Sequence, residues 1–325
     1  MRRKSMIVIV TLSGMLLFAL PLTHAQTDCP TLTAGETYAD RALAIYNQFD
    51  YAAAYELYSC EIELSSPSAE THNMRANSLF AQGLYETAVD DYAEAIALTD
   101  PSMSVTLSVY LTNRGNTYMN FGEYKAALAD YSAAVIADPT NALAHNGRGN
   151  ANYFAGHYAA GVDDYARALG ADSTNAVYWT NRGIAYYFLN DFAAAMQDYN
   201  QALALDPTYA RAYNERGWLY LLQGEPQTAV DDFTQAISLS PATSYYFNRS
   251  DAYAQLGEID FALADYAAIL DLNPGAYNVY VRRGNLYYSI DDLDAALADY
   301  ELYLDAAGTD ADPEIIELVE TLRAS

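Results

Sequence analysis

A period of 34 residues dominates the chain and constrains its fold more than any other feature. Residues 181–207 show the unit most clearly, and a shift of the sequence by 34 residues places Gly183 on Gly149 and on Gly217. A fixed period in this range is typical of architectures built from stacked supersecondary units. One such unit cannot bury its apolar side alone, so consecutive copies must pack on each other. The sequence therefore predicts a solenoid.

Each unit has the pattern of two α-helices joined by a tight turn. In residues 181–207, steps of three and four residues separate the small and apolar positions of each helix, which is helical spacing. A turn near Asn190 separates the two helices, and Pro207 ends the second. Small residues such as Gly183 let the helices approach closely, and aromatic side chains fill the space between them. The chain is therefore expected to be all-α.

This pattern resembles the tetratricopeptide repeat family. The resemblance lies in the small and aromatic residues of the first helix, the series of the second helix and the final proline, which are here Gly183, Tyr186, Ala195, Tyr199, Ala202 and Pro207. Successive copies in phase cover nearly all of the chain after residue 25. The resemblance implies a right-handed superhelical solenoid of helix-turn-helix repeats.

The small residue of the first helix marks eight repeats. The markers are Ala42, Ala76, Gly115, Gly149, Gly183, Gly217, Ser250 and Gly284, at steps of 34, 39, 34, 34, 34, 33 and 34 residues. We expect the repeats within residues 35–308, at about 35–67, 69–101, 108–139, 142–173, 176–207, 210–241, 243–274 and 277–308. The step of 39 predicts a longer joint between Leu98 and Ser108, where the superhelical path can change. Residues 312–324 predict a capping helix that covers the open end of the solenoid.

The first 25 residues predict an export signal. Three basic residues at 2–4 precede an apolar run from Met6 to Leu20, and residues 23–25 offer a cleavage site before Gln26. The alternative is an uncleaved membrane anchor, for which the run is short against the roughly 20 residues of a span. Residues 26–34 then form an N-terminal segment, and we expect a periplasmic or extracellular protein.

The chain is strongly acidic. It carries 42 acidic and 16 basic residues, a net charge of −26, and removal of the three basic residues of the signal leaves 13 and a net charge of −29. Such a surface repels nucleic acid and anionic membranes. It suits either a cationic protein partner or a surface whose charge only maintains solubility. We expect no nucleic-acid ligand and no membrane insertion after signal cleavage.

Two cysteines, Cys29 and Cys60, remain after the signal. An even number of cysteines in an exported chain favours a disulfide, which would tie the N-terminal segment to the second helix of the first repeat. The alternative is a buried free thiol at Cys60. Neither cysteine has histidines arranged around it as in a metal site, and we expect no metal and no cofactor.

Arginine and aspartate recur in phase with the repeat. An arginine precedes every small marker, and an aspartate precedes the second-helix aromatic residue in every repeat but the first, which has Leu57 there. Because an acidic chain has few cations, this regularity predicts a structural ladder of charge-assisted pairs rather than a ligand site. Pairing within one repeat and pairing between neighbours both stay open. The predicted members are Arg75, Arg114, Arg148, Arg182, Arg216, Arg249, Arg283, Asp91, Asp130, Asp164, Asp198, Asp232, Asp265 and Asp299.

The resemblance also implies a concave groove lined by the first helices, with positions three before, one after and four after each marker facing it. Asparagines and aromatic residues occupy many of these positions. An asparagine offers a donor and an acceptor, as a peptide group does, and an aromatic ring adds contact area. Alternatively, the asparagines bond to one another and the rings pack between repeats. The predicted groove residues are Asn73, Asn77, Asn116, Asn146, Asn150, Tyr153, Tyr187, Asn214, Trp218, Asn285 and Tyr288.

We therefore expect a protein-binding scaffold that holds an extended polypeptide in the groove. The alternative is a structural or self-assembling envelope component that acts through its convex face or its ends. The predicted groove has no lysine, and Arg211 and Arg282 lie in separate repeats, which disfavours capture of a C-terminal carboxylate. His72, His145 and His157 form no catalytic or ligand-spaced motif, so we expect no enzyme activity.

Overall fold

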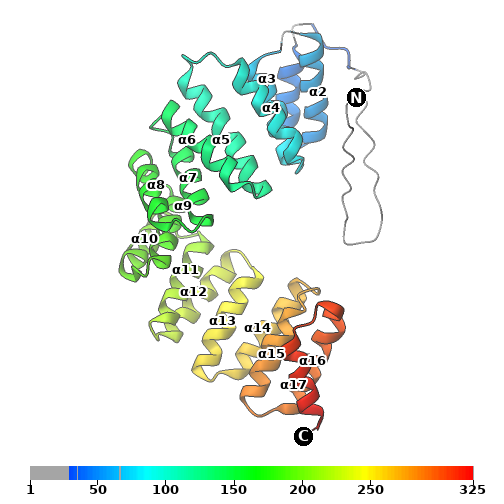
Figure 1. Ribbon diagram of the computed structural model, residues 1–325, viewed down its shortest axis with the longest axis vertical. Coiled ribbons are helices and arrows are strands. Elements are labelled where there is room, and N and C mark those ends of the chain that lie inside the picture. The colour runs from blue at the N-terminus through cyan, green and yellow to red at the C-terminus, as the bar shows by residue number, and fades with distance from the viewer. Residues whose placement is uncertain (1–28, 35, 66, 325) are drawn as a thin grey trace, which may run out of the picture. The chain divides into compact units, whose positions relative to one another are not determined.

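The computed structural model of the 325-residue chain describes residues 29–34, 36–65 and 67–324 (Figure 1). The predicted export signal at residues 1–25 lies outside these ranges. The described residues form 17 α-helices and one 3₁₀ turn, without a strand, so the predicted all-α class is confirmed. In this part of the chain, no helix is both long and apolar enough to cross a membrane.

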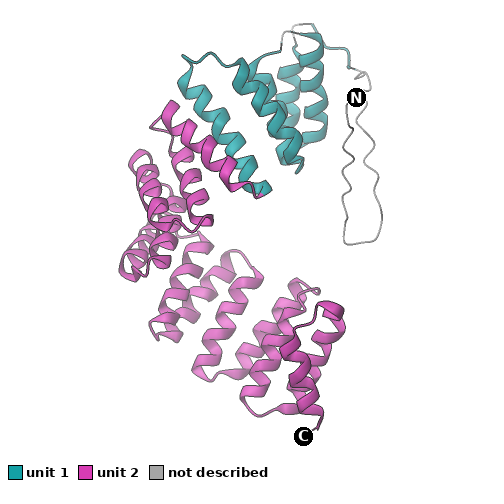
Figure 2. Cartoon of the chain, in the orientation of Figure 1, with its two compact units in different colours: residues 1–121 teal, residues 122–325 magenta. Residues whose placement is uncertain are grey.

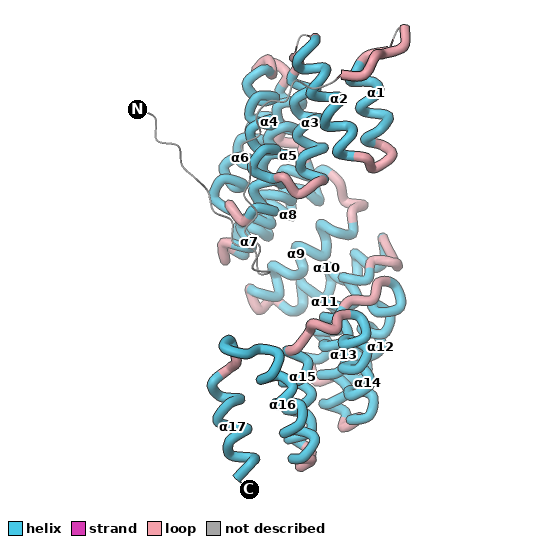
Figure 3. The backbone as a smooth tube through the Cα atoms, turned by 90° about the vertical axis from the view of Figure 1, so that its right-hand side faces the viewer, coloured by secondary structure: helices cyan, strands magenta, loops and turns pink. Residues whose placement is uncertain are grey.

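The chain divides into two compact units after Phe121 (Figure 2). Unit 1 contains α1 (Tyr38–Tyr46), α2 (Tyr51–Leu64), α3 (Ala69–Ala81), α4 (Tyr85–Leu98) and α5 (Ser104–Phe121). Unit 2 contains α6 (Tyr124–Ala137), α7 (Ala142–Phe154), α8 (Tyr158–Ala171), α9 (Ala176–Phe188), α10 (Phe192–Leu205), α11 (Ala210–Leu222), α12 (Pro226–Leu239), α13 (Thr243–Leu256), α14 (Ile259–Leu272), α15 (Asn278–Ser289), α16 (Leu293–Ala307), the 3₁₀ turn η1 (Gly308–Asp310) and α17 (Pro313–Ala324). Short loops connect consecutive helices (Figure 3).

The helices fall within the predicted repeat boundaries. The predicted repeat 142–173 contains α7 and α8, and the predicted repeat 176–207 contains α9 and α10. Within unit 2, α8 packs against α7 of its own repeat and against α9 of the next. In the third predicted repeat, α5 belongs to unit 1 and α6 to unit 2. The helix-turn-helix hairpin is thus the building block of each unit.

Close packing within a hairpin depends on a small residue in the first helix. Tyr199 of α10 is 1% exposed and lies across Gly183 of α9, where an added Cβ would come within 2.6 Å of the tyrosine ring. Ala195 and Ala202 are fully buried on the same second helix. Between the helices, Asn190 adopts a left-handed φ of 62°, which asparagine tolerates better than most residues. Each hairpin therefore contributes its own aromatic layer to the core.

The insertion before the third repeat lengthens a helix and hardly changes the joint. Helix α5 has 18 residues, against 13 in α3 and in α7. The joint before it, residues 99–103, is one residue longer than residues 138–141 between α6 and α7. The predicted long joint between Leu98 and Ser108 is therefore wrong. Once a helix is nucleated, each further residue adds a backbone hydrogen bond, so the inserted residues continue α5.

Helix α17 covers the last hairpin. Ile315 and Val319 are 8% and 1% exposed and pack with Tyr300 and Tyr303 of α16. The hydroxyl of Tyr303 also accepts a hydrogen bond from the backbone N–H of Asp312 at 2.9 Å. These contacts give α17 the position that a capping helix requires.

Candidate functional site

Six arginine–aspartate pairs connect the two helices of a repeat. Between α9 and α10, Arg182 Nε and Nη2 donate to the two carboxylate oxygens of Asp198, both at 2.8 Å. Every such pair lies within one repeat and not between neighbours. The pairs are Arg75–Asp91, Arg148–Asp164, Arg182–Asp198, Arg216–Asp232, Arg249–Asp265 and Arg283–Asp299. The remaining predicted members, Arg114 on α5 and Asp130 on α6, belong to different units.

Aromatic rings of the same helix flank these arginines. The guanidinium of Arg182 lies 4.8 Å from the ring centroid of Trp179 and 5.8 Å from that of Tyr186. Positions three before and four after a residue lie on the same helix face, so both rings reach the cation. The hydrogen bonds to Asp198 raise the pKa of Arg182, so its guanidinium stays charged. The paired arginines stabilise the repeat and leave little of their charge for a ligand.

Two histidines take the place of the first ring in α3 and α7. His72 and His145 are 8% and 4% exposed, and their Nδ1 atoms lie 3.6 and 3.9 Å from the carboxylates of Asp91 and Asp164. His145 Nε2 lies 3.0 Å from the carbonyl oxygen of Pro139, which orients the ring. No cluster of three histidine, cysteine or acidic side chains suited to a metal ion occurs among the described residues. These histidines pack as part of the ladder.

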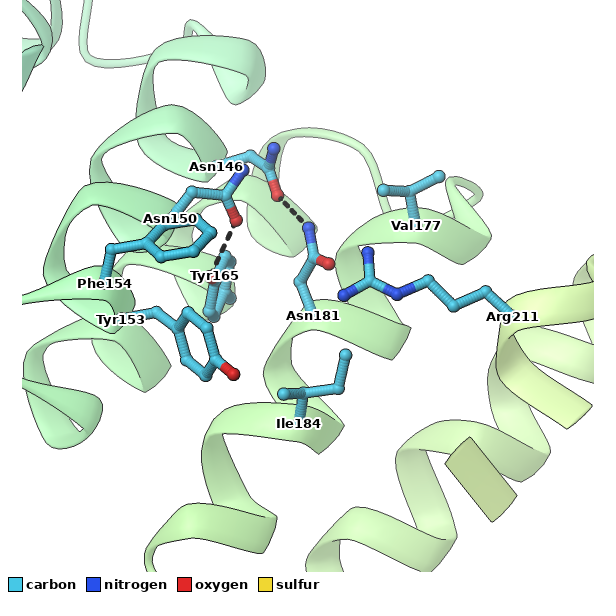
Figure 4. Close-up of a pocket in the computed structure, with 9 residues that line it drawn as sticks. All are labelled: Asn146, Asn150, Tyr153, Phe154, Tyr165, Val177, Asn181, Ile184 and Arg211. Carbon is cyan, nitrogen blue, oxygen red and sulfur yellow. Dashed lines mark hydrogen bonds between the residues drawn. The ribbon is translucent and has the colours of Figure 1, made fainter. Parts of the chain in front are cut away.

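The predicted groove asparagines use their carbonyl oxygens within the protein. Tyr165 Oη donates to Asn150 Oδ1 at 2.8 Å, and Asn181 Nδ2 donates to Asn146 Oδ1 at 3.0 Å (Figure 4). The same contacts recur as Tyr92–Asn77, Tyr300–Asn285, Asn113–Asn73 and Asn248–Asn214. Mutual bonding of the asparagines is thus correct for their oxygen atoms. The side-chain nitrogens of Asn146 and Asn150 form no hydrogen bond with the described residues and remain as donors.

Two adjoining cavities lie along the first helices of unit 2. The first has a volume of about 220 Å³ and is lined by Asn146, Asn150, Tyr153, Phe154, Tyr165, Val177, Asn181, Ile184 and Arg211 (Figure 4). The second has a volume of about 340 Å³ and is lined by Tyr153, Ile184, Tyr187, Phe188, Arg211, Asn214, Glu215, Trp218 and Asn248. Because three residues line both, the cavities form one continuous surface, which we call the unit 2 groove.

Six of the predicted groove residues line the unit 2 groove and five do not. The six are Asn146, Asn150, Tyr153, Tyr187, Asn214 and Trp218. Asn285 and Tyr288 lie on α15, whereas Asn73, Asn77 and Asn116 lie in unit 1. The prediction omitted Asn181 and Asn248, which both stand two residues before a small marker. That second asparagine position was a usable signal in the sequence.

Arg211 presents a positive charge to both cavities. Its side chain is 48% exposed, and its Nε lies 3.9 Å from Glu215 Oε1 one turn further along α11, a loose contact beside the short bonds of the ladder. Burial raises the pKa of Glu215, and the charge of Arg211 opposes that shift. The Arg211 side chain extends from α11 toward Asn181 (Figure 4). This guanidinium can therefore donate to an acceptor on a ligand.

Stacked rings form one wall of the groove. Phe154 and Phe188, at the ends of α7 and α9, are 58% and 43% exposed. They stack on Tyr124 and Tyr158, with ring centroids 5.3 and 4.8 Å apart. Tyr153 contacts both phenylalanines edge-on at 5.3 and 5.4 Å. The rings thus pack between repeats, as the alternative interpretation had it, and also leave apolar surface for a ligand.

A disulfide joins Cys29 to Cys60. It attaches the described segment 29–34 to α2, which is the pairing that the even cysteine number favoured. The described residues contain no free cysteine, so a free thiol at Cys60 is excluded.

Stacked helical hairpins, each closed on a small residue and joined along a groove of first helices, define an α-helical repeat protein. Family models described as tetratricopeptide repeat match residues 176–209, 198–231 and 247–311, and a model described as TPR repeat matches residues 115–156. The chain belongs to the tetratricopeptide repeat family.

Curated relatives match only part of the chain. It is 31% identical over 98 residues to small glutamine-rich tetratricopeptide repeat-containing protein 2 of Mycosarcoma maydis, and 27% identical over 109 residues to DnaJ homolog subfamily C member 7 of Homo sapiens. The matches cover 30% and 34% of this chain. They span only 26% and 21% of the two relatives, about a quarter of their length.

Solved structures match over a longer range. The chain is similar to one in the APC/C hetero-tetramer Cut9-Hcn1, with a TM-score of 0.63, 16% identity, and coverage of 88% of this chain and 55% of that chain. A tetratricopeptide repeat protein from Parabacteroides merdae has a TM-score of 0.59 and 21% identity, over 79% of this chain and 99% of its own. At these identities, the likeness shows a shared fold.

Proposed function

We propose that the protein is a scaffold that holds an extended segment of another protein in the unit 2 groove. Tetratricopeptide repeats typically mediate protein–protein interaction. The observation that carries the proposal for this groove is its row of unpaired donors beside exposed rings. The side-chain nitrogens of Asn146 and Asn150 and the guanidinium of Arg211 line one cavity. Backbone carbonyl oxygens of an extended chain supply acceptors whatever its sequence, and the rings add contact with its side chains.

The charge of the chain supports a partner with basic side chains. A net charge of −26 attracts cations and repels phosphate groups and anionic membranes. The partner is therefore a protein or peptide of cationic character, and nucleic acid is not a ligand. Its backbone carbonyl oxygens, rather than its charges, contact the asparagine nitrogens. In this arrangement the groove provides binding and no catalysis.

The two tryptophans of the chain offer a direct test, because Trp218 lines the groove and Trp179 does not. A Trp179→Phe variant keeps a ring over Arg182 and leaves Trp218 as the sole fluorophore of its kind. Random short peptides selected on the immobilised variant are titrated while Trp218 emission is recorded. We expect selected peptides to change this emission and Arg211→Ala to weaken their binding about tenfold, or ~1.4 kcal/mol.

Arg167→Ala is the matched control, because Arg167 is exposed on α8 and lines neither cavity. It removes the same charge and should leave binding unchanged. Peptides that bind wild-type protein and Arg211→Ala equally, without altering Trp218 emission, would place the binding surface elsewhere. Concentration-dependent self-association without peptide binding would instead favour the structural, self-assembling alternative.

We also propose that the protein is exported and that residues 1–25 are removed. The Cys29–Cys60 disulfide supports this, because disulfides persist mainly in oxidising compartments. Mass spectrometry of the protein from its native cell tests the proposal. A mature chain that begins at Gln26 and carries the disulfide is expected, whereas a chain that retains residues 1–25 would contradict it.

A further inference from the structure

A separate cavity in unit 1 arises where the insertion lengthens α5. It has a volume of about 540 Å³ and lies between the start of α3, the end of α4 and the start of α5. The loop 99–103 and the added first turn of α5 form one side of it. Its volume falls within the roughly 300–1,000 Å³ of small-molecule sites. The repeats of regular spacing lack this insertion, so the cavity is specific to this part of the chain.

Apolar, flexible side chains form much of the cavity wall. Met74, Leu98, Met103 and Tyr110 line it. Leu98 and Met103 are 49% and 53% exposed, which is unusual for apolar side chains that a folded helix could bury. Methionine has an unbranched, polarisable side chain and adapts to ligands of different shape. This wall suits an unbranched aliphatic chain.

The polar part of the wall is negative. Glu70 and Asp100 line the cavity, and no basic residue does. The Ser102 backbone N–H donates to Asp100 Oδ1 at 2.8 Å and lowers the pKa of Asp100, so this carboxylate is ionised near neutral pH. Burial raises the pKa of Tyr110, and the charge of Glu70 raises it further, which places that charge close to the tyrosine. The wall therefore favours a cation.

Other polar groups of the wall are largely occupied, with one exception. Thr99 Oγ1 donates to the Ala95 carbonyl oxygen at 2.7 Å. Asn73 is 7% exposed and accepts a hydrogen bond from Asn113 at 3.0 Å, but its side-chain nitrogen bonds to none of the described residues. This nitrogen is a buried donor at the cavity that lacks an acceptor. Such a group is costly to bury unless a ligand or water satisfies it.

We infer that the unit 1 cavity binds an aliphatic chain that carries an ammonium group. The chain packs against Met74, Leu98 and Met103, and the ammonium lies beside Glu70 and Asp100. Two sources offer this chemistry, the lysine side chain of a polypeptide and a free amphiphilic amine. A polypeptide also offers a backbone carbonyl oxygen for the side-chain nitrogen of Asn73. The inference is independent of the unit 2 groove.

The test uses three probes with the same alkyl chain: n-octylammonium, octanol and octanoate. The full chain, labelled with ¹³C at its methionine methyl groups, is titrated with each probe by NMR; the chain has seven methionines, so the signals are few. We expect octylammonium to shift the signals of Met74 and Met103. It should bind about fivefold more tightly than octanol, and octanoate should bind more weakly than either.

Paired charge variants separate the cavity from the net charge of the chain. Glu70→Gln with Asp100→Asn should remove the preference for ammonium and leave octanol binding unchanged, which also reports that the cavity is intact. Glu86→Gln with Asp90→Asn, two exposed acids of α4, removes the same charge and should keep the preference. Glu70→Gln alone serves if the double variant fails to fold.

Three results would overturn the inference: no shift of Met74 or Met103, equal binding of octylammonium and octanol, or the same loss of preference in both variants. A lysine-containing peptide that displaces octylammonium, while its norleucine counterpart does not, assigns the site to a polypeptide. Displacement by amines alone assigns it to a small molecule.

Discussion

At the scale of the residue, the arginine–aspartate pairs have the largest predicted effect on stability. Asp198 is 4% exposed and accepts both of its short hydrogen bonds from Arg182. Asp198→Asn keeps the shape of the side chain but leaves a buried guanidinium without its counter-charge. Loss of one partner of a buried pair costs about 3–5 kcal/mol, so we expect the urea midpoint of unfolding to fall by the equivalent of about 3 kcal/mol.

Asp163→Asn provides the control for this prediction. Asp163 is exposed on α8, so its substitution removes the same charge outside the ladder and should change stability by less than about 0.5 kcal/mol. An unchanged midpoint for Asp198→Asn would mean that the rings around Arg182, rather than the carboxylate, hold the guanidinium.

At the scale of the helix, two glycines should respond oppositely to the same substitution. In Gly183→Ala the new Cβ would lie 2.6 Å from Tyr199, and overpacking of this kind costs about 1–3 kcal/mol. Gly170 of α8 has nothing within 4 Å of an added Cβ, so Gly170→Ala should stabilise the helix by up to about 1 kcal/mol. Thermal unfolding of the two variants tests the pair. Stabilisation by Gly183→Ala would show that α9 and α10 can separate without penalty.

The disulfide should act on the first hairpin alone. It closes a loop of 31 residues, which in the chain-entropy account stabilises the folded state by about 3–4 kcal/mol. We therefore expect reduction to increase hydrogen exchange in α1 and α2 and to leave α15 unchanged, because solenoid repeats contact only their neighbours. A Cys29→Ser, Cys60→Ser variant should not respond to reductant. Equal loss of protection along the whole chain would mean that unfolding is cooperative from end to end.

Sequence periodicity predicts hairpins well and contacts between hairpins poorly. Gly183 and Tyr199 belong to one repeat, and their recurrence at a fixed step was enough to predict that they meet. The bond from Asn181 to Asn146 joins two repeats and depends on how closely α7 and α9 pack, which spacing does not determine. Arg211 lines cavities because α7, α9 and α11 converge on it. The α5 insertion was placed in a joint because sequence spacing does not distinguish added loop from added helix.

At the scale of the whole molecule, like charge should oppose folding. The chain has 42 acidic and 16 basic residues, and added salt shortens the range of their repulsion, to about 10 Å at 0.1 M and about 3 Å at 1 M. We expect the unfolding midpoint to rise as sodium chloride increases. Buried pairs such as Arg182–Asp198 are screened less than exposed charges, so their loss should not cancel this gain. A midpoint that falls with salt would show that attraction between charges dominates the stability of the chain.

Binding should respond to the same salt series with the opposite sign. If the partner of the unit 2 groove is cationic, the acidic surface accelerates its approach, and screening removes that attraction. Peptides selected on the groove should therefore bind more weakly as sodium chloride increases, mainly through a slower association rate in stopped-flow fluorescence of Trp218. Dissociation should change little, because it depends on contacts with the rings and the asparagine nitrogens. Association rates independent of salt would limit the acidic surface to solubility and would reject a cationic partner, while leaving groove binding itself intact.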